Sequence, residues 1–234
     1  MATEVIAHRG ASGTCPENTL PAFRRAVELG APMIELDVQL TRDGHPVVIH
    51  DWTLERTTSG RGPVRRHTLA EIAALDAGRW FAPTFAGSRV PGLGEVLAAI
   101  PIRINVELKA AGDDGLERRV LETVQAGDAL GRVVFSSFDV SSLARVRGLS
   151  RDAELAILWA GRSIAKALAL ADRVDARSVH LRKSGGAPAA IASGHAAGLA
   201  MRIWTVNAPA DFARLTDAGA DGVFTDYPER FLQT

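Results

Sequence analysis

The chain has 234 residues, enough for one large domain, and hydrophobic residues make up 47% of it, which excludes a disordered chain. Twenty-seven basic residues balance twenty-seven acidic ones, so the basic excess typical of a general nucleic-acid-binding protein is missing. The single cysteine, Cys15, excludes an internal disulfide bond.

Two further features bear on cellular location. The N-terminal sequence MATEVIAHRG lacks the basic region and long apolar run of a signal peptide. No apolar stretch approaches the roughly 20 residues that a membrane-spanning helix requires. We therefore expect a soluble, cytoplasmic protein without stable membrane insertion.

Short apolar runs alternate with segments of helical periodicity along almost the whole chain. Eight strands are predicted, at residues 5–8, 33–38, 102–108, 132–137, 154–159, 178–182, 201–206 and 221–225. Helical spacing lies between most of them, as at 19–29, 115–126 and 163–172. This α/β alternation implies parallel strands with right-handed crossovers. Eight units favour a single TIM (β/α)8 barrel over residues 1–234, and an open doubly wound sheet is the alternative.

The first predicted strand ends in the loop AHRGASGTCPENT, where barrel enzymes place catalytic groups. His8 is suited to proton transfer near neutral pH, and Arg9 offers a fork of donors to phosphate oxygens. Glu17 and Asn18 are expected to brace the loop and orient Arg9. The thiol of Cys15 is either reactive beside basic groups or half-buried and inert.

Residues 34–51 form two apolar runs around an Asp-Gly pair at 43–44, which predicts a β-hairpin after the second strand. With that pair as the two central turn residues, Asp37 lies opposite His50. Glu35, Asp37 and His50 would then share one face, and a shift of one residue would separate them.

Residues 52–92 interrupt the alternation and are expected to form a small cap-like insertion within the barrel domain. The spacing of Thr68 and Glu71 is that of a capping box and predicts one short helix. Three aromatic residues are too apolar for a bare loop and are expected to fold back as a small cap: Trp80, Phe81 and Phe85.

Carboxylates gather on two of the predicted strands. Glu35 and Asp37 are two residues apart, so both side chains point the same way, and Glu107 adds a third on another strand. Such a group is costly unless a positive charge lies among its members. Oxygen donors without cysteine favour Mg²⁺ or Ca²⁺, and zinc with histidine ligands is the alternative. Ion pairs with barrel arginines would be a purely structural role, as would pairing of Lys109 with Glu107.

The sequence resembles the glycerophosphodiester phosphodiesterase family over nearly its whole length. The resemblance is carried by the HRG and PENT loop, the E-x-D and H-D hairpin, the V-E-L-K strand, WTVN at 204–207 and DGVFTDYP at 221–228. The insertion is similar to a short form of that family's insertion. Gly92 and Gly94 depart from the pattern, so the start of the following helix is less well defined.

The resemblance implies hydrolysis of glycerophosphodiesters to sn-glycerol 3-phosphate and an alcohol. It assigns catalysis to His8 and His50, phosphate binding to Arg9 and Lys109, and one divalent cation, Mg²⁺ or Ca²⁺, to Glu35, Asp37 and Glu107. The glycerol 2-hydroxyl is expected to attack phosphorus, and water then opens the cyclic phosphate. One histidine acts as base and the other as acid, in an order that the sequence does not assign.

Three further residues are candidates for contact with the substrate. Trp204 and Phe138 either line the glycerol or alcohol side of the pocket or are ordinary packing. His180, near the end of its strand, is a candidate for substrate contact. Asp226 is expected to cap the last helix.

Two other functions are compatible with a barrel of this kind. A lysophospholipid substrate, cut as a phospholipase D would cut it, requires an apolar route for an acyl chain. A non-catalytic phosphate-binding barrel would lose a histidine or a carboxylate, whereas every expected position is filled here. A small-molecule substrate is expected and nucleic acid is not. The oligomeric state cannot be read from the sequence.

Overall fold

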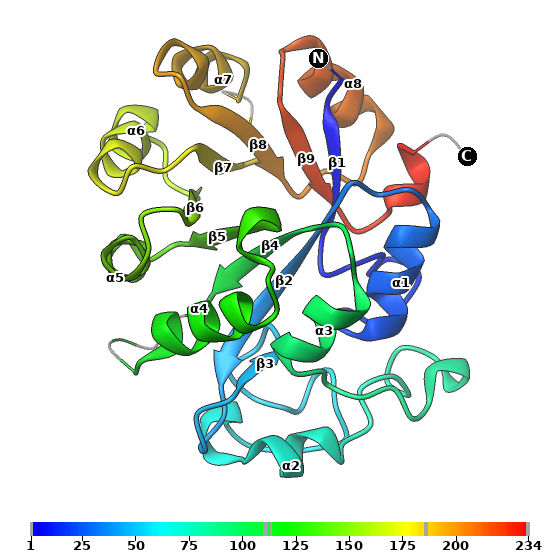
Figure 1. The fold of residues 1–234 in the computed structure, drawn as a ribbon. Coiled ribbons are helices and arrows are strands. Elements are labelled where there is room, and N and C mark those ends of the chain that lie inside the picture. The colour runs from blue at the N-terminus through cyan, green and yellow to red at the C-terminus, as the bar shows by residue number, and fades with distance from the viewer. Residues whose placement is uncertain (1, 110–111, 113, 185–186, 233–234) are drawn as a thin grey trace.

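The chain folds into a closed barrel of eight parallel strands surrounded by helices (Figure 1). The structure, a computed structural model, describes residues 2–109, 112, 114–184 and 187–232. The strands are β1 (Glu4–Ala7), β2 (Met33–Leu40), β3 (Pro46–Val48), β4 (Arg103–Leu108), β5 (Val133–Ser137), β6 (Glu154–Trp159), β7 (Ser178–Arg182), β8 (Ala200–Trp204) and β9 (Gly222–Thr225). The α-helices are α1 (Leu20–Glu28), α2 (Leu69–Ala73), α3 (Leu93–Ala99), α4 (Leu116–Ala126), α5 (Val140–Leu149), α6 (Ile164–Arg173), α7 (Ala187–Ala196) and α8 (Pro209–Asp217).

The first strand closes the barrel because β1 pairs in parallel with both β2 and β9. The other barrel strands follow in chain order, each paired in parallel with the next, while β3 pairs only with β2 and lies outside the ring. The predicted TIM barrel is therefore confirmed, and the open sheet is excluded. All eight predicted strands are present, with ends that differ by at most two residues.

Strand β2 shows how the sequence divides the core into two layers. Ile34, Leu36 and Val38 pack in the large hydrophobic core that includes helix residues, whereas Met33 belongs to a small cluster with Ile6 and other inward-facing residues of the barrel. Since side chains alternate along a strand, Glu35 and Asp37 point inward above Met33. The barrel interior is thus apolar at its base and acidic toward the carboxyl ends of the strands.

The hairpin after β2 forms, but the predicted register is wrong by one residue. Val38 pairs with Val48 and Leu40 with Pro46, so position 49, not His50, lies opposite Asp37. Gly44 has a φ of 78°, and its N–H donates to the carbonyl of Thr41, which makes a three-residue loop instead of a two-residue turn. Strand β3 ends at Val48, so the backbone at His50 is free of the ladder.

The segment between β3 and α3 has a small core of its own. Leu54, Val64, Ile72 and Val90 are buried together in a cluster that also contains residues of the hairpin. Helix α2 begins with the predicted capping box, in which Thr68 Oγ1 accepts from the Glu71 N–H and the Glu71 carboxylate accepts from the Thr68 N–H. This segment lies beside β3 at one end of the molecule (Figure 1).

The three aromatic residues singled out in the insertion contact one another. The ring of Phe81 makes edge contacts with those of Trp80 and Phe85, at centroid distances of 5.7 Å each.

Among helices of the described residues, none has the length and apolar character that crossing a membrane requires. Cys15 is buried, and burial raises the pKa of its thiol, which favours the inert reading of that residue.

Candidate active site

A cavity of about 200 Å³ opens at the carboxyl ends of the barrel strands. Its polar lining includes His8, Arg9, Glu35, His50, Asn105, Glu107 and Lys109. Its apolar lining includes Phe138, Leu158, Trp204 and Phe224. One wall is therefore charged and the opposite wall is aromatic and aliphatic, and the structure brings most of the predicted site residues into one space.

The loop after β1 holds His8 and Arg9 in an unusual backbone conformation. Arg9 has a φ of 57° and Gly10 a φ of 80°. A Cβ atom on Gly10 would lie 2.6 Å from the backbone carbon of Ala22, so only glycine fits there. This tight turn also brings the backbone N–H of Arg9 to 2.9 Å from Glu35 Oε2.

Three carboxylates meet at the base of the cavity. One oxygen from each of Glu35, Asp37 and Glu107 lies within 4.8 Å of the others. Their proximity follows from the sheet, because Asp37 on β2 pairs in register with Glu107 on β4 and Glu35 lies two residues earlier. Glu35 and Asp37 are almost fully buried. An acidic group of this composition could hold a metal ion.

Two side-chain cations accompany the three acids. Arg9 Nε lies 3.3 Å from Asp37 Oδ2, and Lys109 Nζ lies 3.6 Å from Asp37 Oδ1 and 3.1 Å from Glu107 Oε1. Lys109 therefore fulfils the counter-ion role anticipated for it, and its ammonium also lies at the cavity. Asn18 braces the loop as expected, because its backbone N–H donates to the Arg9 carbonyl at 3.1 Å, while its side-chain Nδ2 donates to Asp37 at 2.9 Å and so orients Asp37.

The pKa values of the acids show that these two cations do not compensate them fully. Burial, and then the charges of Asp37 and Glu107, raise the pKa of Glu35 well above its ordinary value. Burial and the nearby Asp37 raise the pKa of Glu107 to about 7. Although burial opposes it, attraction to Arg9 and Lys109 lowers the pKa of Asp37. The raised pKa values mean that ionising all three carboxylates together is unfavourable. A divalent cation would relieve their mutual repulsion, and the all-oxygen donors suit a hard cation.

His8 is held by a carboxylate from the other end of the chain. Its Nδ1 lies 2.7 Å from Asp226 Oδ1, and Asp226 is fixed in turn by Asn207 and Ser12. This hydrogen bond places the proton on Nδ1, which leaves Nε2 for the cavity, 3.9 Å from Glu35 Oε2. Asp226 caps no helix, because the short 3₁₀ turn after it runs from Pro228 to Arg230 and begins after Tyr227. The predicted capping role of Asp226 is therefore wrong.

His50 has the same arrangement with its neighbour in sequence. Its Nδ1 lies 2.7 Å from Asp51 Oδ1. Burial, and then the charges of Arg9 and Lys109, lower the pKa of His50, although Asp37 opposes this change. The structure thus brings His50 to the site despite the hairpin register, because the chain turns after β3 ends.

A further arginine links the two parts of the site. Arg56 donates to both oxygens of Asp51, at 2.6 and 2.9 Å, and to both oxygens of Glu17, at 2.7 and 2.8 Å. Glu17 also accepts from Arg9 Nη1 at 2.9 Å, so it does orient Arg9 as expected. Hydrogen bonds from Arg56 hold the pKa of Asp51 well below its ordinary value.

The aromatic wall is formed mainly by Phe138 and Trp204. Their rings meet edge to face with centroids 5.7 Å apart, and Phe138 is 54% exposed. His180 is absent from the lining of the cavity: its side chain is 1% exposed and packs against Phe224. The expected contact of His180 with substrate is therefore not supported by its position in the barrel.

Sequence reasoning missed Asp51 and Arg56 and gave Asp226 a role other than the one its contact with His8 indicates. Asp226 directly follows the last barrel strand, as His8 directly follows the first. Because barrel enzymes place catalytic groups at these strand ends, the position of Asp226 could have indicated a role in the site. Asp51 stands beside a histidine already singled out. No pattern in the sequence identifies Arg56, because its partners are 5 and 39 residues away.

Comparison with known proteins gives consistent matches. Residues 8–230 match the glycerophosphoryl diester phosphodiesterase family. The chain is 40% identical to a glycerophosphodiester phosphodiesterase of Caldanaerobacter subterraneus, an alignment that covers 99% of this chain and 97% of the other. It is 36% identical to one from Bacillus altitudinis, over 99% and 97% of the two chains. A solved structure of an Oleispira antarctica phosphodiesterase, in complex with the product sn-glycerol-3-phosphate, matches with a TM-score of 0.89 and 30% identity, over 98% and 95% of the two chains.

Proposed function

The chain belongs to the glycerophosphoryl diester phosphodiesterase family and is a glycerophosphodiester phosphodiesterase; on that premise, we propose that His8 and His50 transfer the protons of the reaction beside one divalent cation. The substrate is a glycerophosphodiester, and the products are sn-glycerol 3-phosphate and an alcohol. The product-bound Oleispira antarctica phosphodiesterase supports this choice of product.

Glu35, Asp37 and Glu107 would hold the cation. Their oxygens are close enough to share one ion, and the set contains no sulfur or nitrogen donor, which favours Mg²⁺ or Ca²⁺ over zinc. When bound, the cation would supply positive charge next to the phosphoryl oxygens as negative charge builds up on phosphorus.

Arg9 and Lys109 would bind the phosphoryl oxygens. Arg9 is held by Glu17 through Nη1, its Nε lies beside Asp37, and the residue lines the cavity. Lys109 lines the cavity, and its ammonium is supported by the carboxylates of Asp37 and Glu107. Phe138 and Trp204 on the opposite wall would contact the carbon atoms of glycerol.

The two imidazoles would divide the proton transfers between them. In the first step one Nε2 removes the proton of the glycerol 2-hydroxyl, the new O–P bond forms, and the bond from phosphorus to the alcohol oxygen breaks. The other histidine, protonated, donates its Nε2 proton to that departing oxygen. Water then opens the cyclic phosphate with the roles reversed. Asp226 and Asp51 would stabilise the imidazolium that forms at His8 or His50.

The observation that carries this proposal is the placement of two carboxylate-held histidines beside three carboxylates and two cations. The test measures glycerol 3-phosphate release from glycerophosphocholine before and after treatment with EDTA. We expect activity to be lost on chelation and restored by Mg²⁺ or Ca²⁺. Full activity after exhaustive chelation would refute the metal assignment, and full activity of both H8A and H50A would refute the roles of the histidines.

A further inference from the structure

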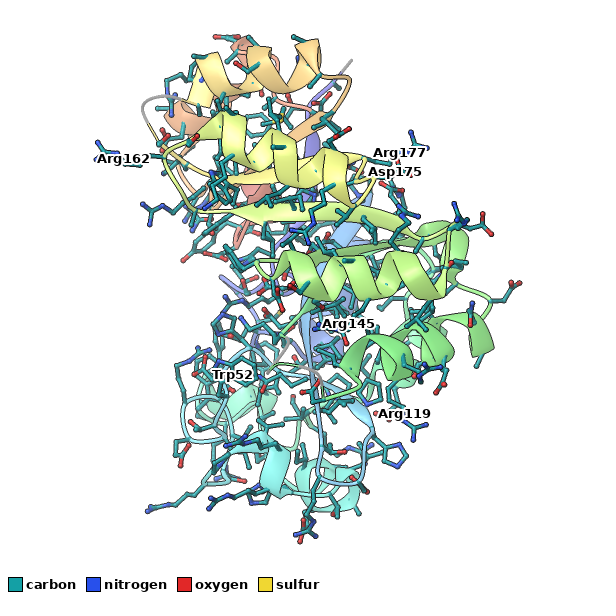
Figure 2. All side chains as sticks on the ribbon, turned by 90° about the vertical axis from the view of Figure 1, so that its left-hand side faces the viewer. Trp52, Arg119, Arg145, Arg162, Asp175 and Arg177 are labelled. Carbon is teal, nitrogen blue, oxygen red and sulfur yellow. The ribbon has the colours of Figure 1, made fainter. Side chains whose placement is uncertain are left out.

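A second cavity, of about 300 Å³, adjoins the active site at Lys109, which lines both spaces. Its other walls include Trp52, Pro63, Arg65 and Asp114. Trp52 and Arg162 lie at the same end of the barrel, opposite the end that carries Asp175 and Arg177 (Figure 2). Arg162 follows β6 and Asp175 precedes β7, so Trp52 is at the carboxyl-terminal mouth, where the substrate enters.

The position of this second cavity suits the alcohol portion of the substrate. The phosphate of the substrate would lie at Lys109, so a group attached to it on the side away from the aromatic wall would reach the second cavity. Trp52 also comes two residues after His50, so one wall of the second cavity belongs to the segment that carries this histidine. Nothing in the proposed reaction uses Trp52, although its indole is 49% exposed.

The charges of the lining decide which alcohols fit. Arg65 is exposed and forms no ion pair with a carboxylate in the part of the chain that the structure describes. Asp114 is also exposed, and its Oδ1 accepts the backbone N–H of Leu116, which leaves the second oxygen for other donors. The cavity therefore presents one aromatic plane, two cationic side chains, Arg65 and Lys109, and one carboxylate.

That combination fits a polyhydroxy alcohol. Hydroxyl groups accept from a guanidinium and donate to a carboxylate, while the C–H face of a polyol or sugar ring packs on an indole. A trimethylammonium group offers Arg65 no acceptor, and its positive charge would be repelled by the guanidinium. We propose that this cavity is the leaving-group subsite and that it selects substrates whose alcohol is glycerol, inositol or a sugar over those with choline.

The proposal rests on the proposed function, and its test uses three substrates of one enzyme. Glycerophosphoinositol and glycerophosphocholine are compared with the methyl ester of glycerol 3-phosphate, whose leaving group is too small to reach Trp52. Each kcat/KM is divided by the value for the methyl ester. For the wild-type enzyme the inositol ratio should exceed the choline ratio. In W52A and R65M the inositol ratio should fall about tenfold, as loss of a stacking or hydrogen-bonding partner predicts.

Two control variants come from the same segment. Trp80 is 41% exposed but lines neither cavity, and Arg66 is the exposed neighbour of Arg65, so W80A and R66M should leave the inositol ratio at its wild-type value. A higher choline than inositol ratio in the wild type, or unchanged ratios in both W52A and R65M, would overturn the subsite. If no substrate yields glycerol 3-phosphate, the proposed function fails instead, and the two failures are thereby distinguished.

Discussion

The guanidinium of Arg56 holds the carboxylate of Asp51 through two hydrogen bonds, from Nε to Oδ2 at 2.6 Å and from Nη2 to Oδ1 at 2.9 Å. The same guanidinium also binds Glu17, which in turn holds Arg9. Arg56, a residue of the insertion, therefore fixes both Asp51, the partner of His50, and Glu17, the partner of Arg9. Bidentate pairing of this kind restricts both distance and orientation.

Replacement of Arg56 should lower turnover more than it lowers stability. In R56M both Asp51 and Glu17 lose their shared partner, so we expect kcat to fall by about 100-fold, because small displacements of reacting groups cost about that much. R56K should recover part of the loss, since an ammonium binds only as a point charge. The measurements are kcat, KM and urea unfolding. R61M, in an exposed arginine of the same segment, serves as control, and equal kcat in R56M and R61M would contradict this role.

Asp226 and Asp51 should affect turnover because each controls which ring nitrogen of its histidine carries a proton. In D226N and D51N the new amide no longer stabilises an imidazolium at His8 or His50, and it can favour the wrong ring tautomer. We expect kcat to fall by about 100-fold or more in each variant with little change in the unfolding midpoint, as in other enzymes with a carboxylate-held histidine. N207D serves as a comparison variant, because it alters the environment of Asp226 and keeps the Asp226 carboxylate in place. Wild-type kcat in both D226N and D51N would rule out this function of the pairs.

Removal of one acid from the cluster should have opposite effects on metal-free stability and on activity. E107Q relieves repulsion among three neighbouring carboxylates, so we expect the metal-free variant to be more stable than the wild type by about 1–3 kcal/mol. The same change should weaken binding of Mg²⁺ or Ca²⁺ and abolish turnover. The measurements are urea unfolding in EDTA and the thermal shift on addition of metal, which should be large for the wild type and small for E107Q. A less stable E107Q in EDTA would show that the wild-type cluster is compensated without a cation.

The buried His180 should make stability depend on pH. Burial, together with the charge of Arg202, lowers the pKa of His180 well below its ordinary value of 6.5. Below pH 6.5 the unfolded chain binds a proton at this residue that the folded chain does not bind, so stability is full above pH 6.5 and falls with decreasing pH. The slope from this residue is at most about 1.4 kcal/mol per pH unit.

The matched variant for this pH dependence is H180Q, which keeps a polar group near Ser178. The free energy of unfolding is measured in urea from pH 8 to pH 5 for both proteins. We expect the wild type to lose more stability than H180Q over this interval. The same pH dependence of stability in both proteins would contradict this prediction, because it would mean that His180 takes up a proton as readily in the folded protein as in the unfolded chain.

The sequence was sufficient for the barrel and for the acidic face, because both follow from periodicity. Apolar runs alternating with helical spacing identify the strands, and Glu35 and Asp37 share a face wherever the strand begins. The hairpin register was not accessible in this way. An Asp-Gly pair is compatible with a two-residue or a three-residue loop, and only the φ of Gly44 and its contact with Thr41 distinguish them.

Asp51, the partner of His50, lay outside the reach of local sequence patterns. Asp51 follows His50 directly, and adjacent residues on a strand point to opposite faces, so a strand at this point would have kept them apart. They meet because β3 ends at Val48. His180 shows the converse limit: its strand was predicted correctly, but its depth in the barrel depends on packing against Phe224.

The hydrogen bond between His8 and Asp226 joins residues that are 218 positions apart. During synthesis the ribosome makes His8 before Asp226, and strands β2 to β9 are all made between these two residues. A nascent chain therefore holds an unpartnered histidine until β9 inserts between β8 and β1. We expect hydrolytic capacity to arise abruptly at that moment, so that fragments released before Asp226 are inert however much of the barrel they have formed.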